Sequence, residues 1–172
     1  FAPYKHDVFL DYAWNPDRID ANDVRPYTEK WATQQFGTKH ATAIAELLSK
    51  YAKYNSRRKP EMLDDKTYSF FYGEWETVVN DYNELLNKAE EINSQLTAEQ
   101  KDAFFQLVLH PIKACANLNE LYYNVALNKE AFKEKYERTN EYADKVKELY
   151  QKDSLITLEY HRLNNGKWNH MM

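Results

Sequence analysis

Glycine, proline and cysteine are scarce in this sequence, and their scarcity narrows the choice of fold. The 172 residues include 3 Gly, 5 Pro and 1 Cys. Few glycines, together with many Glu, Lys, Leu and Ala, favour helices over sheets. The single Cys115 cannot form an internal disulfide. Because it stands in an apolar helical run, we interpret it as a buried structural thiol rather than a reactive one.

Long apolar runs and an excess of positive charge are also missing. No apolar stretch is long enough to span a membrane, so we expect no membrane partner. The net charge of −4 argues against nucleic acid as a partner, because phosphate backbones bind basic surfaces. The first residues, FAPYKHD, include no Met, and we expect them to continue a longer chain.

Motifs that hold metals, cofactors or phosphate do not occur in the sequence. A di-iron bundle needs Glu-x-x-His on two facing helices, whereas Glu159 and His161 are only two residues apart. No two histidines have zinc-like spacing, and we find neither a glycine-rich phosphate loop nor a G-x-S-x-G elbow. We therefore expect no metal, no cofactor and no catalytic residue within this chain.

Helical periodicity is the main pattern that is present. Apolar residues recur at intervals of three and four, and no segment alternates as a half-buried strand does. The periodicity predicts helices over 4–14, 23–36, 39–58, 67–93, 97–127 and 129–151, the last being extended by SLITLEYHRL and stopped by NNG at 164–166. We predict an all-α fold, an antiparallel helix bundle of about five long helices.

Local signals set several boundaries of these helices. Gly37 is a C-terminal stop and Thr38 a cap for the next helix. Thr97 and Gln100 fit a capping box. The stretch 97–127 is apolar over a wide arc, which predicts a central helix, and Pro111 should kink it near Leu107 because its ring clashes with the preceding turn. The stretch 67–93 carries the clearest stripe: Phe71, Trp75, Val78, Val79, Tyr82, Leu85, Leu86, Ala89 and Ile92.

Aromatic residues make up 15% of the chain, with 14 Tyr and 4 Trp, and they suit core packing, domain contacts or sugar stacking.

In KYAKYNSRRKPE, at 50–61, the basic residues favour a helix C-terminus through the helix dipole. The alternative is a contact to an anion or a partner, since Arg pairs carboxylates in a forked geometry. We take Tyr54, Arg57 and Arg58 as domain-interface candidates.

The last seven residues, GKWNHMM, are unusually apolar for a chain end. Exposing Trp168 and Met171 to water would be costly. We expect Trp168, His170 and Met171 to dock onto protein outside this chain, with a sugar or ligand contact as the alternative.

Five blocks of the sequence together resemble glycoside hydrolase family 115, the xylan α-glucuronidases. They occur in order across essentially the whole chain. The blocks are DYAWNP at 11–16, YTEKWATQQFG at 27–37, LLSKYAKYNSRRKPE at 47–61, AFFQLVLHPIKACANLNELYY at 103–123 and GKWNHMM at 166–172.

The resemblance implies that the chain is part of a larger hemicellulose-degrading hydrolase. In that family a (β/α)8 barrel precedes a helical bundle, and a β-rich domain follows it. Members release glucuronic acid or its 4-O-methyl ether from the α-1,2 branches of glucuronoxylan, with inversion. An inverting glycosidase needs two carboxyl groups about 6.5–9.5 Å apart. The family's catalytic groups belong to the barrel, and no motif here matches them.

The resemblance also divides the chain. Residues 1–16 would be the tail of the barrel, including its last helix, and residues 17–172 the helical accessory domain. Because barrel active sites sit at the loops that follow the strands, Pro3, Tyr4 and Lys5 would be the residues closest to substrate. The expected partners are the neighbouring barrel and β-rich domains of the same polypeptide, glucuronoxylan, and a second copy of the chain. The family suggests a secreted or periplasmic location.

Two other interpretations remain open from the residues alone. One is an autonomous helical module that binds carbohydrate or protein through its Tyr-rich surface. The other is a structural bundle from an unrelated protein. A barrel encoded upstream would favour the accessory domain, whereas an exposed aromatic strip with affinity for xylan would favour the binding module.

Overall fold

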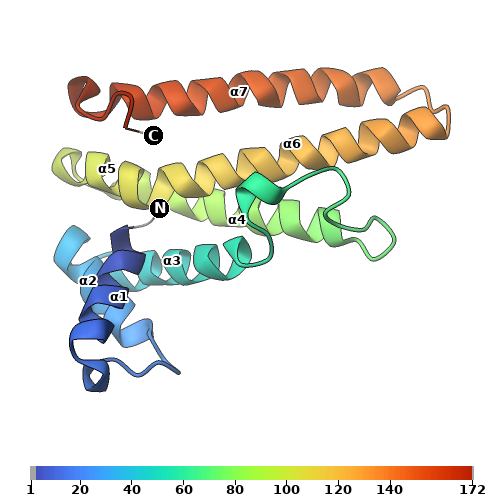
Figure 1. Ribbon diagram of the computed structural model, residues 1–172. Coiled ribbons are helices and arrows are strands. Elements are labelled where there is room, and N and C mark those ends of the chain that lie inside the picture. The colour runs from blue at the N-terminus through green and yellow to red at the C-terminus, as the bar shows by residue number, and fades with distance from the viewer. Residues whose placement is uncertain (1–2, 172) are drawn as a thin grey trace.

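The computed structural model describes residues 3–171, and every regular element in that range is helical (Figure 1). The prediction of an all-α antiparallel bundle is confirmed. The elements are α1 (Pro3–Trp14), η1 (Pro16–Arg18), α2 (Arg25–Phe36), α3 (Ala41–Asn55), η2 (Pro60–Met62), α4 (Glu74–Gln95), α5 (Ala98–Phe104), η3 (Phe105–Leu109), α6 (His110–Lys133) and α7 (Thr139–Gly166).

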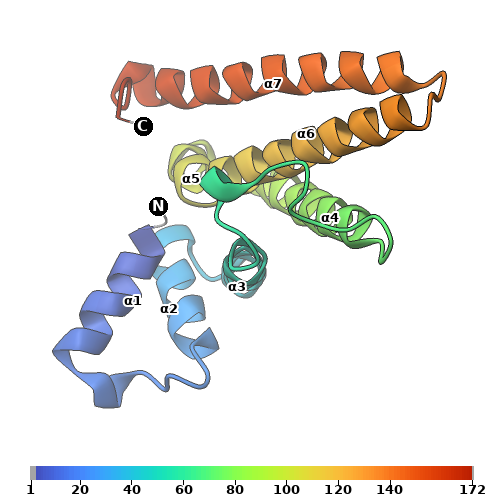
Figure 2. The ribbon, with the colours of Figure 1, turned by 45° about the vertical axis from the view of Figure 1, so that its right-hand side comes forward.

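Helix α6 is the central element of the bundle, as the apolar arc predicts. It packs against α7 on one side and α4 on the other, and α4 also contacts α3 (Figures 1 and 2). Helices α1 and α2 form a pair at the edge, with α2 packed on α3. Figure 2 shows α1 and α2 spreading apart toward the loop that joins them.

The predicted irregularity in the central helix is present, and it takes the form of a π-helix. Helices α5 and α6 are continuous through η3, in which the N–H of His110 donates to the carbonyl of Phe105, five residues earlier. Pro111 follows directly and has no N–H to give to Leu107. A single wide turn accommodates the missing bond, as π-bulges do inside longer helices.

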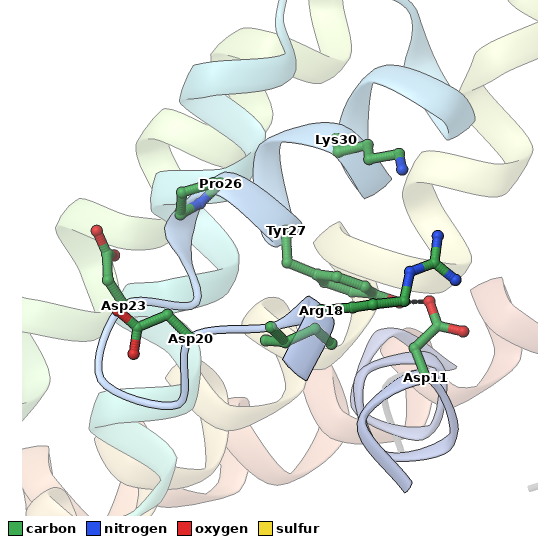
Figure 3. A pocket seen from close by; sticks show the side chains of 8 residues that line it. Asp11, Arg18, Asp20, Asp23, Pro26, Tyr27 and Lys30 are labelled. Atoms are coloured by element: carbon green, nitrogen blue, oxygen red, sulfur yellow. Dashed lines mark hydrogen bonds between the residues drawn. The ribbon is translucent and has the colours of Figure 1, made fainter. Parts of the chain in front are cut away.

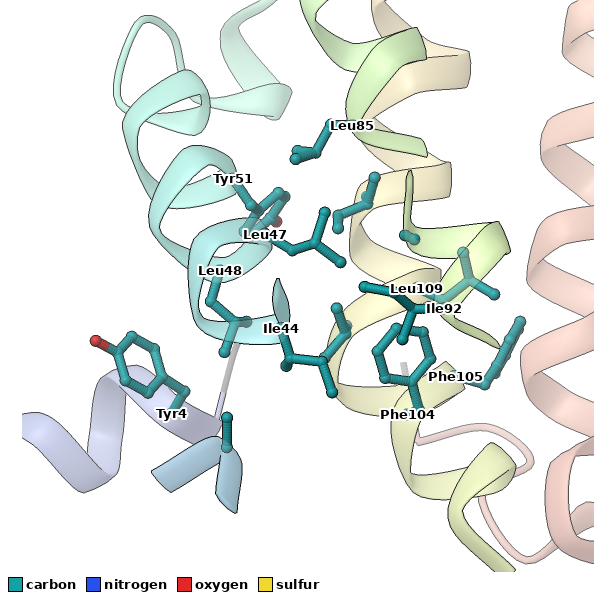
Figure 4. Packing of buried hydrophobic residues seen from close by; sticks show 14 of the residues in the cluster. Tyr4, Ile44, Leu47, Leu48, Tyr51, Leu85, Ile92, Phe104, Phe105 and Leu109 are labelled. Carbon is teal, nitrogen blue, oxygen red and sulfur yellow. The ribbon is translucent and has the colours of Figure 1, made fainter. Parts of the chain in front are cut away.

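One continuous core connects all the long helices, and Figure 4 shows the part of it that lies between α1, α3, α4 and α5. It begins at Tyr4 of α1 and reaches Tyr160 of α7. The largest side chains with almost no exposed surface are Trp75, Phe36, Phe104, Ile44, Leu85, Ile112 and Leu149. The stripes predicted for α3 and α4 supply much of this core, so helical spacing identifies most buried positions.

Several predicted boundaries are confirmed. Gly37 ends α2 with φ +77°, a conformation that favours glycine. Thr97 and Gln100 form the capping box, with Gln100 Oε1 accepting from the Thr97 N–H at 3.1 Å. Helix α7 loses helical backbone angles at Leu163, and Asn164 to Gly166 all have positive φ, so NNG does stop it.

Three local predictions are wrong. Thr38 does not cap α3, because the residue before that helix is His40 and no side chain caps it. Helix α4 begins at Glu74 rather than 67, so Phe71 lies outside it and is 86% exposed. The chain does not break near 128 but at 134–138, where Lys135 has φ +60° without a glycine to mark the turn.

Candidate functional site

The two residues predicted to lie nearest the substrate differ in their surroundings. Tyr4 is 9% exposed, and its ring meets Trp31 edge-on at 5.5 Å. Its hydroxyl lies 2.5 Å from Oγ1 of Thr28. Lys5 is exposed. Their proximity to substrate stays a prediction, and Pro3 stands at the start of α1 beside them.

Carboxylates on the inner side of α1 hold α2 in place. Asp7 accepts a hydrogen bond from Nε1 of Trp31 at 2.7 Å, and Asp11 accepts one from the hydroxyl of Tyr27 at 2.8 Å. Four residues separate the two carboxylates, so both lie on the same face of the helix. This face fixes the angle between α1 and α2 at the edge of the bundle.

A cavity of about 260 Å³ lies where α1 and α2 spread apart, closed on its third side by the connecting loop (Figure 3). We call it the α1–α2 pocket. Its lining consists of Asp11, Arg18, Ile19, Asp20, Asp23, Pro26, Tyr27 and Lys30. The lining therefore combines one aromatic ring, two cations and three carboxylates around apolar Ile19 and Pro26.

The charges in the α1–α2 pocket are only partly paired. Asp23 accepts a forked pair of hydrogen bonds from Arg25, at 2.8 and 2.9 Å, and this guanidinium lowers the pKa of the carboxyl. By contrast, within residues 3–171 the side-chain nitrogens of Arg18 and Lys30 have neither a hydrogen bond nor an ion pair. Two cations thus remain available at one cavity.

The ring of Tyr27 is fixed in the wall of the pocket. Burial, followed by the hydrogen bond to Asp11, raises the pKa of Tyr27 to about 12. The phenol therefore stays protonated near neutral pH and donates to the carboxylate. A neutral, oriented aromatic ring beside charged groups suits a ligand with both an apolar face and polar edges.

The interface candidates at the end of α3 and in the turn that follows it contact the chain's own residues. Arg57 forms an ion pair with Asp81 of α4 and lies over the ring of Tyr54, 4.5 Å from its centroid. Nε of Arg58 donates to the carbonyl of Met62 at 3.0 Å. These contacts join α3 to α4 and to the following loop, and a domain contact at these residues stays a prediction.

The candidates near the end of the chain fold back on α7. Trp168 is half-buried and packs against the core, with Nζ of Lys167 5.0 Å from its ring centroid. The N–H of His170 donates to Nδ1 of His161 at 3.3 Å. Met171 is 68% exposed. Docking of this segment onto other protein also stays a prediction.

Cys115 is buried, as expected for a structural thiol. Its Sγ lies 3.8 Å from the hydroxyl of Tyr51, and burial raises the pKa of the thiol.

In the part of the chain that the structure describes, no group of His, Cys, Asp or Glu is arranged to hold a metal ion. Over the same part, no helix is both long and apolar enough to cross a membrane.

Sequence reasoning missed the α1–α2 pocket. Its residues fall within the 20 positions from Asp11 to Lys30, but they come from two helices and the turns between them. The available signals are the asparagine and aspartate turns of this loop, in which Asn15 accepts from the N–H of Asp17 and Asp20 from that of Asn22. Such turns indicate a shaped loop, but not what it surrounds.

The comparisons with known proteins agree on one family. A sequence model of glycosyl hydrolase family 115 matches residues 2–62. A solved structure, described as a family GH115 4-O-methyl-α-glucuronidase, BtGH115A, with specificity for decorated arabinogalactans, superposes with a TM-score of 0.79 and 26% identity over 99% of this chain. Both similarities are to glycosyl hydrolase family 115: one is in sequence over residues 2–62, and the other is in fold over nearly the whole chain. The helical chain spans 23% of the length of BtGH115A. The comparison with curated proteins gave no match.

Proposed function

We propose that this chain is the helical accessory part of a glycosyl hydrolase family 115 enzyme that releases glucuronic acid, or its 4-O-methyl ether, from a polysaccharide. The observation that carries the proposal is the match of nearly the whole chain to one part of a 4-O-methyl-α-glucuronidase. The segment would stabilise the enzyme and shape its surroundings rather than perform the reaction. The accessory role distinguishes this proposal from that of an autonomous binding module.

Hydrogen bonds favour the ionised form of three carboxyl groups in the domain. A glycosidase acid is a carboxyl group whose pKa is raised, so that it stays protonated until it reaches the leaving group. Among residues 3–171, the carboxyl groups with a resolved shift are Asp23, Glu46 and Asp64, and the pKa of each is lowered by hydrogen bonds. None of them has the environment of a general acid.

For the reaction itself we propose the chemistry that the family resemblance implies, hydrolysis of α-1,2-linked uronic acid branches with inversion. The polysaccharide is glucuronoxylan in this proposal. The arabinogalactan specificity in the description of BtGH115A makes that polysaccharide the second substrate to test. The uronic acid branch is common to both, and it is the part that would be recognised.

We further propose that residues 1–16 are the last helix of a preceding barrel and residues 17–172 the accessory domain. Helix α1 supports this arrangement because its outward side chains are apolar: Phe9 and Leu10 are largely exposed, and Trp14 is 86% exposed. An exposed apolar helix face of this kind is typical of a surface that packs against other protein. Tyr4 and Lys5 would then stand where the barrel opens to substrate.

Uronic acid release by three proteins tests the proposal: the longer protein that contains this sequence, the same protein without residues 23–165, and this chain alone. We expect release from the first and none from the third. If the shortened protein is folded, as judged by circular dichroism, yet inactive, the bundle is required to complete the enzyme.

Substitution of the outward face of α1 tests the domain arrangement in the longer protein. Trp14→Ala should lower the midpoint of thermal unfolding and the rate of uronic acid release, because it removes a side chain that packs against the barrel in this proposal. Phe71→Ala, which removes an equally exposed ring elsewhere, is the matched control. Equal effects of the two substitutions would refute a special role for the α1 face.

A further inference from the structure

We propose that the α1–α2 pocket is a binding site for a single carboxylated sugar, a hexuronic acid residue, separate from any centre of hydrolysis. The inference rests on the shape and charge of the cavity. It does not depend on the proposed glucuronidase activity, because the lining residues named above all belong to this chain. It assigns to the domain a recognition function in addition to its accessory role.

The two available cations suit a carboxylate ligand. Arg18 and Lys30 both line the cavity, and within the described residues neither charged group has a partner. Figure 3 shows them toward the same end of the cavity as Asp11, while Asp20 and Asp23 lie toward the other end. A guanidinium binds a carboxylate through two parallel hydrogen bonds, and the ammonium adds a second charge.

The carboxylates in the lining favour a ligand that carries hydroxyl groups as well as a carboxylate over a simple anion. Asp11 and Asp20 have acceptor positions free for hydroxyl groups, since each has two carboxylate oxygens and is exposed. A simple anion such as acetate would meet the cations but has no hydroxyl group to donate to the carboxylates. A sugar acid places its carboxylate on Arg18 and Lys30 and its hydroxyls on Asp11 and Asp20.

The apolar part of the lining matches the C–H face of a pyranose ring. The Tyr27 ring is anchored by its hydrogen bond to Asp11, and Ile19 and Pro26 stand beside it. Anchored aromatic rings bind with little entropy cost because their orientation is set beforehand. The ring, the cations and the acceptors surround one volume, which is what recognition of one sugar residue requires.

The size of the cavity limits the ligand to about one ring. Its 260 Å³ lies just below the range of about 300–1,000 Å³ typical of pockets for drug-sized molecules. A longer oligosaccharide would have to extend out of the mouth. The ligand is therefore either a free uronic acid or a uronic acid branch that leaves its backbone outside.

Chemical-shift mapping on this chain tests the site directly. One buried core joins α1 to α7, so the residues that line the pocket are carried by a single packed body. We would titrate the ¹⁵N-labelled chain with glucuronic acid, with a glucuronic acid-substituted xylo-oligosaccharide, with glucose and with acetate. We expect saturable shifts at Arg18, Tyr27 and Lys30 with a Kd on the order of 1 mM for one or both uronic acid ligands. Shifts with the oligosaccharide alone would identify the branch as the ligand, and shifts with the free acid alone would identify the released sugar.

Charge-neutral variants complete the test. Arg18→Gln together with Lys30→Gln should weaken binding on the order of tenfold or more, because both charged contacts are lost. The control is Arg138→Gln, which changes the charge in the same sense at a residue outside the pocket. The proposal is overturned if no uronic acid ligand gives saturable shifts, if acetate binds as well as glucuronic acid, or if the double variant binds like the control.

Discussion

The hydroxyl of Tyr4 donates a hydrogen bond to Oγ1 of Thr28 across the buried contact between α1 and α2. The two oxygens are 2.5 Å apart. Thr28 uses its only hydroxyl hydrogen on the carbonyl of Val24, at 2.9 Å, so Tyr4 must be the donor in the pair. Helix α1 is thereby attached to the bundle by a directed interaction as well as by packing.

Removal of that hydroxyl should lower stability. Tyr4→Phe leaves the Thr28 oxygen without its second partner, and we expect the free energy of unfolding to fall by about 1 kcal/mol. Urea unfolding followed by circular dichroism measures the change. Lys5→Ala, at the exposed neighbouring position, should change stability by less than about 0.5 kcal/mol. Equal stability of Tyr4→Phe and the wild type would show that the hydrogen bond contributes nothing.

The same pair of positions also tests the substrate-proximal prediction in the longer protein. If Tyr4 and Lys5 lie near the substrate, Lys5→Ala should alter turnover or the Michaelis constant without altering stability. If the activities of Tyr4→Phe and Lys5→Ala change only as much as their stabilities do, Tyr4 is a packing residue and Lys5 does not lie near the substrate.

Two phenylalanines offer a matched test of the core. Phe104 is fully buried beside Phe36, with ring centroids 5.7 Å apart, whereas Phe71 is 86% exposed. Phe104→Ala should cost about 3–5 kcal/mol because it leaves a cavity. Phe71→Ala should cost less than about 0.5 kcal/mol. Denaturant unfolding measures both free energies. Similar losses for the two variants would contradict the buried position of Phe104 and the exposed position of Phe71 before α4.

The ion pair between Arg57 and Asp81 should contribute modestly. Each side chain keeps more than a quarter of its surface exposed, so water and salt screen the charges. A double-mutant cycle with Arg57→Gln and Asp81→Asn should give a coupling energy of about 0.5–1 kcal/mol that decreases in high salt. A coupling near zero at low salt would mean that the two helices are held together without this pair.

His110 should make stability depend on pH. Burial between Phe105 and Tyr160 lowers its pKa below the ordinary 6.5, although the nearby Glu159 opposes the shift and Lys113 and His161 add to it. The unfolded chain then binds the proton more readily than the folded one. The stabilising effect of the neutral ring is complete above the unfolded pKa, and it is lost as pH falls through the folded pKa.

Replacement of the imidazole should remove that dependence. Wild type should lose more stability than His110→Phe when pH is lowered from about 7.5 to 5, since phenylalanine fits the aromatic contacts and does not titrate. Urea midpoints at each pH provide the measurement. Parallel pH profiles for the two proteins would show that another group controls the acid sensitivity.

Most of the fold could be predicted because helical spacing and helix punctuation are local. Pro26, Gly37, Thr97 and the NNG triplet act within one turn of the backbone, and each marks a true boundary. The turn between α6 and α7 has no such marker. Local backbone hydrogen bonds close it, among them the one from the N–H of Tyr136 to the carbonyl of Ala131, and a side-chain contact spans it, in which Nδ2 of Asn128 donates to the carbonyl of Thr139 at 2.7 Å. A local pattern does not contain that information.

The α1–α2 pocket could not be predicted because its properties depend on the angle between two helices. Asp7 and Asp11 look like ordinary surface carboxylates in the sequence. Only the fold shows that they accept hydrogen bonds from Trp31 and Tyr27 and so set that angle. Among residues 3–171, the absence of partners for the side-chain charges of Arg18 and Lys30 is likewise a property of the three-dimensional arrangement.

The most direct test of the account is the identity of the sugar that the longer protein releases from glucuronoxylan and from decorated arabinogalactan. We predict glucuronic acid or its 4-O-methyl ether as the product from at least one of these polysaccharides, and no product from this chain alone. Product from neither polysaccharide, with a folded longer protein, would contradict the proposed glucuronidase function. Product from this chain alone would contradict its accessory role.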